Sequence, residues 1–211
     1  HGAVEVAGAL AEAGTEMLGV ATVEEAVELR DYGLELPILL LGGIRPEEAW
    51  VAVEHSLTPT IYSLETAKAL DYESARADKR TPYHLKIDTG MARLGVDAPD
   101  AGEFAAELSG LTNIYMEGIF THLASAFLET PETTDEQLAL FTEAVRAVRE
   151  NGHNPGYVHS ANSVAAVRHP ASRMDLVRPG IILYGAGVEG VAHALAARTG
   201  GRLWIGGRAL F

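Results

Sequence analysis

Residues 86–95 read KIDTGMARLG and lie at the end of an apolar, β-rich run at 83–88. In α/β proteins the loops at the C-terminal ends of parallel strands carry the binding sites. A lysine at a strand end, followed by an arginine seven residues later, can form a cationic site for an anion. We therefore regard Lys86 and Arg93 as a candidate anion site. The alternative, which spacing alone favours, is a salt bridge at the strand end with Asp88.

Outward from this stretch, β-rich runs alternate with helical segments along the whole chain. Most of the runs are apolar on both faces, as expected for strands buried in a parallel sheet. The predicted strands are 18–22, 37–42, 59–63, 83–88, 114–122, 157–162, 177–185 and 202–207. Apolar residues at helical spacing predict helices at 4–13, 23–32, 46–55, 64–77, 103–108, 135–150 and 191–198. This alternation fits an α/β barrel or a doubly wound sheet. The count of eight strands favours a TIM-type (β/α)8 barrel.

The composition excludes several classes of function. The 211 residues, 47% hydrophobic and 21% charged, suit one soluble globular domain. There is no cysteine, so neither disulfides nor thiolate metal sites can form, and we predict no metal site. The longest apolar runs are only a few residues, too short to span a bilayer. A formal net charge of −13 argues against a nucleic-acid partner, because phosphates require a basic patch.

Two further strand ends carry candidate binding residues. Residues 157–163 read YVHSANS, and Ser163 has two interpretations. It is placed as a helix N-cap, and it could also help to bind an anion at the start of the helix. Residues 177–185 read VRPGIILYG, where Gly180 allows a ligand to approach the backbone closely. Phosphate sites of barrel enzymes often lie between two such adjacent strands.

Four motifs together resemble the barrel domain of bacterial alanine racemase, a pyridoxal-phosphate enzyme. They are residues 86–95, 120–122 (FTH), 159–163 (HSANS) and 178–185 (RPGIILYG). The resemblance covers nearly the whole chain. It implies a small-molecule partner, either pyridoxal phosphate or a simple anion, and a cytoplasmic location.

The resemblance also implies a role for each matching residue around the cofactor. Lys86 matches a supporting lysine that is carbamylated in many members and holds the neighbouring arginine. Arg93 matches that arginine, which contacts the phenolic oxygen of the cofactor. His122 matches a histidine beside the pyridine ring, and Arg178 matches the arginine that faces the pyridine nitrogen and keeps it unprotonated.

Three more residues match those that bind the cofactor phosphate in the family: Ser163, Gly180 and Ile181. No catalytic base is identified in this chain. In the family, a strand that begins like Leu203-Trp204 carries the Schiff-base lysine. Aligned on that pair, Arg208 stands where the lysine belongs. A guanidinium stays protonated and offers no free amine to an aldehyde.

The position of this strand predicts a circular permutation within a single barrel domain, residues 1–211. Residues 1–185 would contain the region of natural strands two to eight, and 186–190 would be the junction. Residues 191–211 would be the relocated first helix and strand, so that the natural first strand comes last. We therefore expect residues 203–205 to pair with both the 18–22 and the 177–185 strands.

These departures predict an engineered racemase barrel without racemase activity. The family's second domain, which helps form its homodimer and supplies a catalytic tyrosine, has no match here, and racemisation needs two bases. We expect a residual phosphate site in which pyridoxal phosphate is absent or weakly bound, and where phosphate or sulfate can bind. One alternative is an active alanine racemase whose lysine comes from a missing segment or a partner chain. The other is a non-catalytic carrier of pyridoxal phosphate, although the sequences of the 86–95 and 178–185 motifs match those of racemases.

Overall fold

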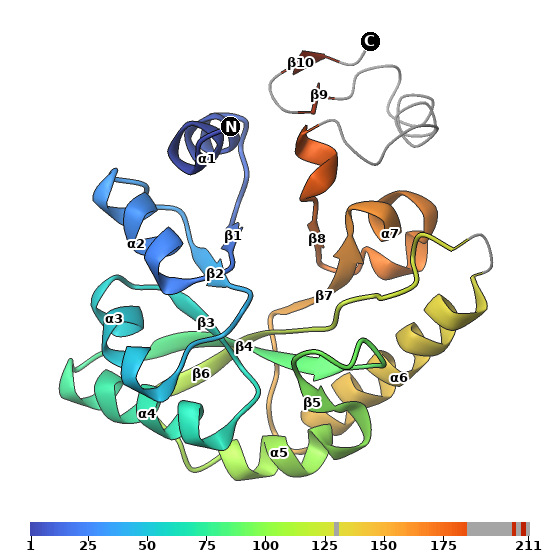
Figure 1. Cartoon of the computed structure of the whole chain (residues 1–211). Helices are drawn as coiled ribbons and strands as arrows, with labels where there is room; N and C mark the ends of the chain where they lie inside the picture. Colours follow the sequence, from blue (N-terminus) through green and yellow to red (C-terminus); the bar gives the residue numbers. More distant parts are fainter. Residues whose placement is uncertain (129–130, 185–203, 206–207, 210–211) are drawn as a thin grey trace.

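The computed structural model describes residues 1–128, 131–184, 204–205 and 208–209 (Figure 1). Its first eight strands are β1 (Leu18–Val20), β2 (Ile38–Leu40), β3 (Thr58–Ile61), β4 (Thr81–Asp88), β5 (Val96–Asp97), β6 (Ile114–Phe120), β7 (Tyr157–Asn162) and β8 (Leu176–Arg178). The α-helices are α1 (Ala3–Glu12), α2 (Val23–Asp31), α3 (Ala49–Glu54), α4 (Leu64–Arg76), α5 (Ala101–Leu108), α6 (Glu132–Glu150) and α7 (Ser163–Arg168). Short 3-10 turns are η1 (Pro46–Glu48), η2 (Ala98–Asp100), η3 (Pro170–Ser172) and η4 (Ile181–Tyr184).

The eight strands form one parallel sheet that curves nearly closed, as in a TIM-type barrel. Seven of them follow the order β1-β2-β3-β4-β6-β7-β8, and β5 pairs only with β4. In Figure 1 the strands run in an arc from β1 to β8 with the helices outside them. The predicted fold class is confirmed. The carboxyl ends of the parallel strands therefore share one rim, where a binding site is expected.

The two faces of β4 show how the sequence separates core from interior. Tyr83, Leu85 and Ile87 are buried in the main apolar core together with residues of the surrounding helices. Because side chains alternate along a strand, His84 and Lys86 project from the opposite face, toward the inside of the barrel. Both are also buried. The inward face of β4 is thus polar, while its face toward the helices is apolar.

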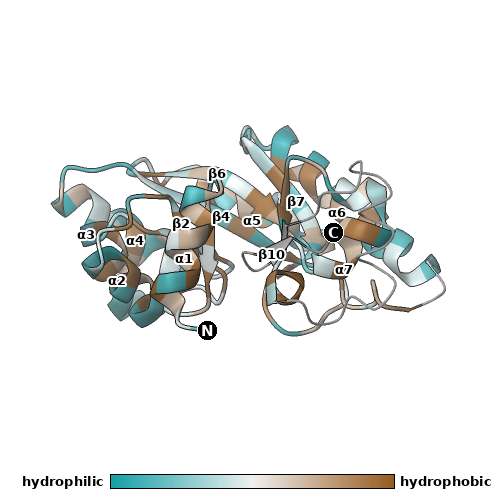
Figure 2. Ribbon diagram, turned by 90° about the horizontal axis from the view of Figure 1, so that it is seen from above, coloured by the Kyte–Doolittle hydropathy of each residue, from teal (hydrophilic) through white to brown (hydrophobic). Residues whose placement is uncertain are grey.

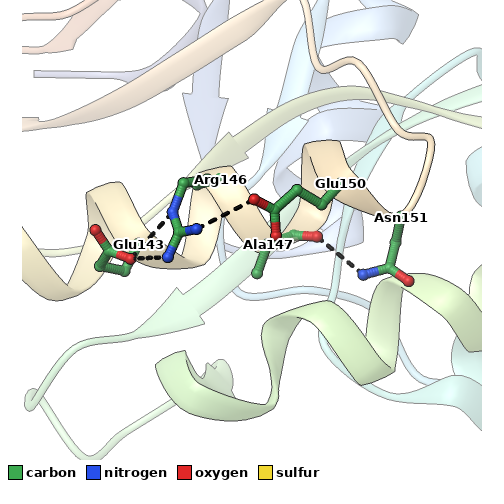
Figure 3. Close-up of polar contacts among 5 residues, drawn as sticks. All are labelled: Glu143, Arg146, Ala147, Glu150 and Asn151. Carbon is green, nitrogen blue, oxygen red and sulfur yellow. Dashed lines mark hydrogen bonds and ion pairs between the residues drawn. The ribbon is translucent and has the colours of Figure 1, made fainter.

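The outer helices meet solvent with charged side chains. Figure 2 shows hydrophilic residues on α2 and α3. On α6, Arg146 forms ion pairs with Glu143 and with Glu150, the latter at 3.1 Å, and Asn151 donates to the Ala147 carbonyl at 3.0 Å (Figure 3). These pairs are one turn apart on an exposed face, so they favour the helix only slightly and are screened by salt. In the described part of the chain, no helix is long and apolar enough to cross a membrane.

The chain after Arg178 differs from its prediction in two ways. The strand expected at 177–185 ends at Arg178, because Pro179 has no amide hydrogen to continue the ladder, and η4 follows. The strand expected at 202–207 is present as β9 (Trp204–Ile205), but it pairs antiparallel with β10 (Arg208–Ala209) in a sheet of its own. The intervening pair Gly206-Gly207 is a sequence that two-residue hairpin loops favour.

For Trp204 and Ile205 the expected pairing with the 18–22 and 177–185 strands is therefore wrong, whereas Leu203 lies outside the described residues. The eighth strand of the parallel sheet is β5, and among the described residues no strand lies between β1 and β8. This removes the strand pairing on which the circular permutation depended. The predicted junction at 186–190 and the predicted helix at 191–198 lie outside the described residues.

Candidate active site at the strand ends

A small pocket lies at the carboxyl ends of β4 and β6. The residues that line it are Lys86, Ile87, Asp88, Met91, Arg93, Leu94, Thr121 and His122. Three of the predicted site residues, Lys86, Arg93 and His122, therefore come together here. Arg93 is exposed, whereas Lys86 is only 4% exposed.

The loop after β4 is organised by Asp88, and not by a salt bridge. Its Oδ1 accepts hydrogen bonds from the amides of Gly90, Met91 and Ala92 at 2.8, 2.9 and 3.2 Å. Partial burial opposes ionisation, but these amide hydrogen bonds outweigh it and lower the pKa of Asp88. Within the described residues no ion pair joins Asp88 to either cation, so the salt-bridge interpretation is wrong. The Asp88 carboxylate is instead satisfied by the amides of its own loop.

Lys86 is a buried amine close to neutrality. Burial lowers its pKa to about 7, and the charges of Arg178 and Arg93 act in the same direction. Its Nζ lies 4.3 Å from the centre of the Phe120 ring. An amine with this pKa exists partly unprotonated at pH 7, and is far more nucleophilic than an exposed lysine.

His122 is a neutral imidazole at physiological pH. Burial, together with the nearby charges of Arg178, Lys86 and Arg93, lowers its pKa to about 4. A group with this pKa does not gain a proton until the pH falls well below 6. His122 can therefore contact an aromatic ligand without adding charge.

Arg178 is held in a fixed orientation at the end of β8. Its Nη2 donates to the carbonyls of Thr121 and Ser160, at 2.7 and 3.1 Å, and its Nη1 lies 2.8 Å from Nδ1 of His159. Burial lowers the pKa of Arg178 to about 10, so it stays protonated at neutral pH. Sequence reasoning identified Arg178 but missed His159, whose contact depends on strand register.

Ser163 joins the ends of β7 and β8. Its Oγ accepts a hydrogen bond from the Gly180 amide at 2.9 Å, and the Ile182 amide lies 3.5 Å away. The prediction that Ser163 caps a helix is wrong. The cap is Asn162, whose Oδ1 accepts from the Ala165 amide at 3.0 Å, so that Ser163 is free to turn toward β8. This cradle brings together two of the predicted phosphate residues.

The third predicted phosphate residue, Ile181, lies beside this cradle with its side chain 55% exposed. The amide that approaches Ser163 is that of Ile182, which sequence reasoning missed by one position. A methyl group added at Gly180 would meet no atom within 4 Å, so there is open space above its backbone. Arg208, the residue matched to the Schiff-base lysine, lies in β10, outside the parallel sheet.

A nearly closed parallel barrel, with cationic side chains and a backbone cradle at its strand ends, places this chain in the TIM-barrel class. Residues 1–188 match the family described as "Alanine racemase, N-terminal domain". This chain belongs to that family. The predicted resemblance is confirmed.

Relatives with known names support this assignment over most of the chain. Alanine racemase of Desulfovibrio desulfuricans is 42% identical over 88% of this chain and 50% of its own length. The enzyme from Methanococcus maripaludis is 39% identical over 92% of this chain and 52% of its own. The chain spans about half the length of the curated relatives it matches.

Solved structures agree with the barrel. Alanine racemase of Clostridium difficile 630 superposes with a TM-score of 0.83 at 37% identity, covering 87% of this chain and 48% of that one. The protein from Streptomyces lavendulae, a D-cycloserine producer, superposes with a TM-score of 0.84 at 29% identity. That match covers 96% of this chain and 53% of the other.

Proposed function

We propose that this chain forms the phosphate- and ring-binding part of a pyridoxal-phosphate site, and that by itself it does not racemise alanine. The observation that carries the proposal is the cradle between Ser163 and the Gly180–Ile182 backbone, with the Arg178 cation at the end of the same strand, β8. Backbone amides and a hydroxyl suit a phosphate group, as at other backbone phosphate sites. If the cofactor carries a second anionic oxygen, the positive charges of Arg93 and Lys86 would balance the charge of that oxygen.

The donor set fits this cofactor in its charges as well as in its position. Arg178 is a permanent donor, so it would give the pyridine nitrogen a hydrogen bond without giving it a proton. His122 is neutral and would lie against the ring. When bound, pyridoxal phosphate supplies an electron sink for the α-carbon of an amino acid. The protein's part is to hold the ring and to keep the pyridine nitrogen from gaining a positive charge.

The missing element is the amine that attaches the cofactor. The chain has only three lysines. Lys68 is exposed on α4, and Lys79 donates to the Val53 carbonyl at 2.8 Å, which leaves Lys86 as the one lysine in the site. Lys86 and Arg93 line the same pocket, and the family resemblance gives Lys86 a supporting role there. Racemisation also requires a second base on the opposite side of the substrate.

Complete activity would therefore need a lysine-bearing strand from elsewhere in a longer protein or from a partner chain. The edges of β1 and β8 are where such a strand can pair, because both face an unoccupied position among the described strands. A second domain and a homodimer, as the family resemblance implies, would supply the other base. The carrier alternative has no specific observation in its favour.

The purified chain incubated with pyridoxal phosphate and L-alanine should form no D-alanine above the buffer control. No D-alanine is expected because this chain has neither of the two bases that racemisation requires. Chiral chromatography measures the product. Equilibrium dialysis should nevertheless show weak binding of the cofactor. Formation of D-alanine that disappears in the Lys86→Met variant would contradict the proposal, because contaminating host enzyme would be unaffected by that substitution.

A further inference from the structure

Four polar side chains, two of them only partly buried, form a row across four strands. Nη1 of Arg178 on β8 lies 2.8 Å from Nδ1 of His159 on β7, and Nε2 of His159 lies 2.9 Å from Nδ1 of His84 on β4. Nε2 of His84 is 3.4 Å from Oε2 of Glu117 on β6. Both imidazoles are fully buried.

The first member of this row determines the proton positions of all the others. A guanidinium can only donate, so Nδ1 of His159 must accept and its proton must be on Nε2. That proton is donated to Nδ1 of His84, which places the proton of His84 on its own Nε2. The Glu117 carboxylate is 3.4 Å from this nitrogen, outside hydrogen-bond geometry. The row therefore runs from a guanidinium through two imidazoles toward a carboxylate, and its two hydrogen bonds have their donors pointing the same way.

At the far end of the row, neither facing atom makes a hydrogen bond to a described residue. Nε2 of His84 and Oε2 of Glu117 are buried, and neither has a conventional hydrogen-bond partner among the described residues. The two atoms lie 3.4 Å apart. A carboxylate oxygen this close to a buried ring nitrogen favours the arrangement with the proton on Nε2 by electrostatic attraction.

Two irregularities in the sheet build this row. Tyr83 pairs with Met116 and His84 pairs with Gly118, so Glu117 is an extra residue in β6. A bulge of this kind re-aims side chains, and here it places Glu117 on the side of His84. The β7–β8 pairing has a second register shift directly after His159.

Gly118 makes the space for the His84 ring. A Cβ at position 118 would lie 2.5 Å from Cε1 and 2.7 Å from both ring nitrogens of His84. Only glycine leaves room for the imidazole at this place in the strand. The row is thus specified by a glycine, a bulge and two buried histidines.

We propose that His84 and Glu117 are positioning residues that act through His159 to keep Arg178 oriented as a donor toward the ligand. His159 accepts only from Arg178 because its other nitrogen is committed to His84. The relevance of this row to the cofactor rests on the proposed function, in which Arg178 faces the pyridine nitrogen. The proton arrangement itself holds in the free protein.

The direct test is the protonation state of the two rings in the full chain, without any ligand. Nitrogen NMR of the histidine-labelled protein distinguishes Nδ1-H from Nε2-H, and coupling through the hydrogen bond identifies the two connected rings. We expect both His84 and His159 to carry a single proton on Nε2 at pH 7. A proton on Nδ1 of either ring, or a doubly protonated ring, would overturn the proposal. Failure of pyridoxal phosphate to bind would contradict only the proposed function.

Variants separate positioning from simple packing. Glu117→Leu removes the carboxylate 3.4 Å from His84, so the Nε2 resonance of His84 should shift while its proton stays on Nε2, whereas Glu117→Gln keeps a carbonyl oxygen there and should shift it less. Gly118→Ala should displace the His84 ring and abolish the coupling between the two rings, while Gly110→Ala, which meets no atom within 4 Å, should leave it unchanged. Identical spectra for Glu117→Leu and the unmodified chain would show that Glu117 does not position His84.

Discussion

Replacing Lys86 with methionine should remove a strong pH dependence from the stability of this protein. The pKa of Lys86 is lowered from its ordinary 10.5 to about 7 in the folded chain, chiefly by burial. Between these values the unfolded chain holds a proton that the folded chain has released. The free energy of unfolding must therefore rise with pH across this window, by up to about 1.4 kcal/mol per pH unit. Methionine has a similar length, can pack on Phe120, and carries no proton.

Urea unfolding at pH 7.5, 8.5 and 9.5 measures this slope. This range stays below the region where Tyr83 acts, because burial raises the pKa of that phenol and its effect appears above pH 10. Lys68→Met on the exposed face of α4 is the matched control and should keep the slope of the unmodified chain. An equal slope in Lys86→Met would show that Lys86 is not desolvated in the folded protein.

Gly95→Ala should be the most damaging single methyl addition in the site loop. Gly95 has a φ of +134°, which side chains rarely adopt, and its Cβ would lie 2.6 Å from the amide nitrogen of Asp88 and 2.8 Å from the carbonyl carbon of Ile87. Backbone atoms at the end of β4 cannot move aside as a flexible side chain could. We expect a loss of about 2–5 kcal/mol in the free energy of unfolding, from strain and overpacking together.

The control for this substitution is Gly110→Ala, where φ is not positive and the added methyl meets open space. Its free energy of unfolding should stay within about 1 kcal/mol of the unmodified chain. Chemical unfolding of both variants gives the comparison. If Gly95→Ala unfolds no more easily than Gly110→Ala, the close approach of this loop to the end of β4 is not real.

The strands and helices of the barrel could be predicted from the sequence because their signals are local. β4 was predicted at 83–88 from its buried residues, and the structure extends it only to Thr81–Asp88. The strand near the C-terminus shows the limit of such reasoning. Its β-rich composition predicted a strand correctly, but composition does not say which edge it joins, and a hairpin competes with the long-range pairing.

The site residues were predicted well where a contact follows from neighbouring strand ends. Ser163 and Gly180 meet because β7 and β8 are adjacent. The choice of helix cap could not be made, since Asn162 and Ser163 are both good caps and differ by one position. The connection of Arg178 through His159 to His84 could not be predicted either. It depends on bulges that shift register, and a pattern of alternating residues does not reveal them.

The measurement that tests the central claim most directly is a titration of the labelled chain with inorganic phosphate, followed by amide NMR. The amides of Ser163, Gly180 and Ile182 should shift together and saturate. In Ser163→Asp the added negative charge should abolish the response, whereas Ser63→Asp, the same change at the N-cap of α4, should preserve it. No response at these three amides in the unmodified chain, or an equal response in Ser163→Asp, would contradict a phosphate site between β7 and β8.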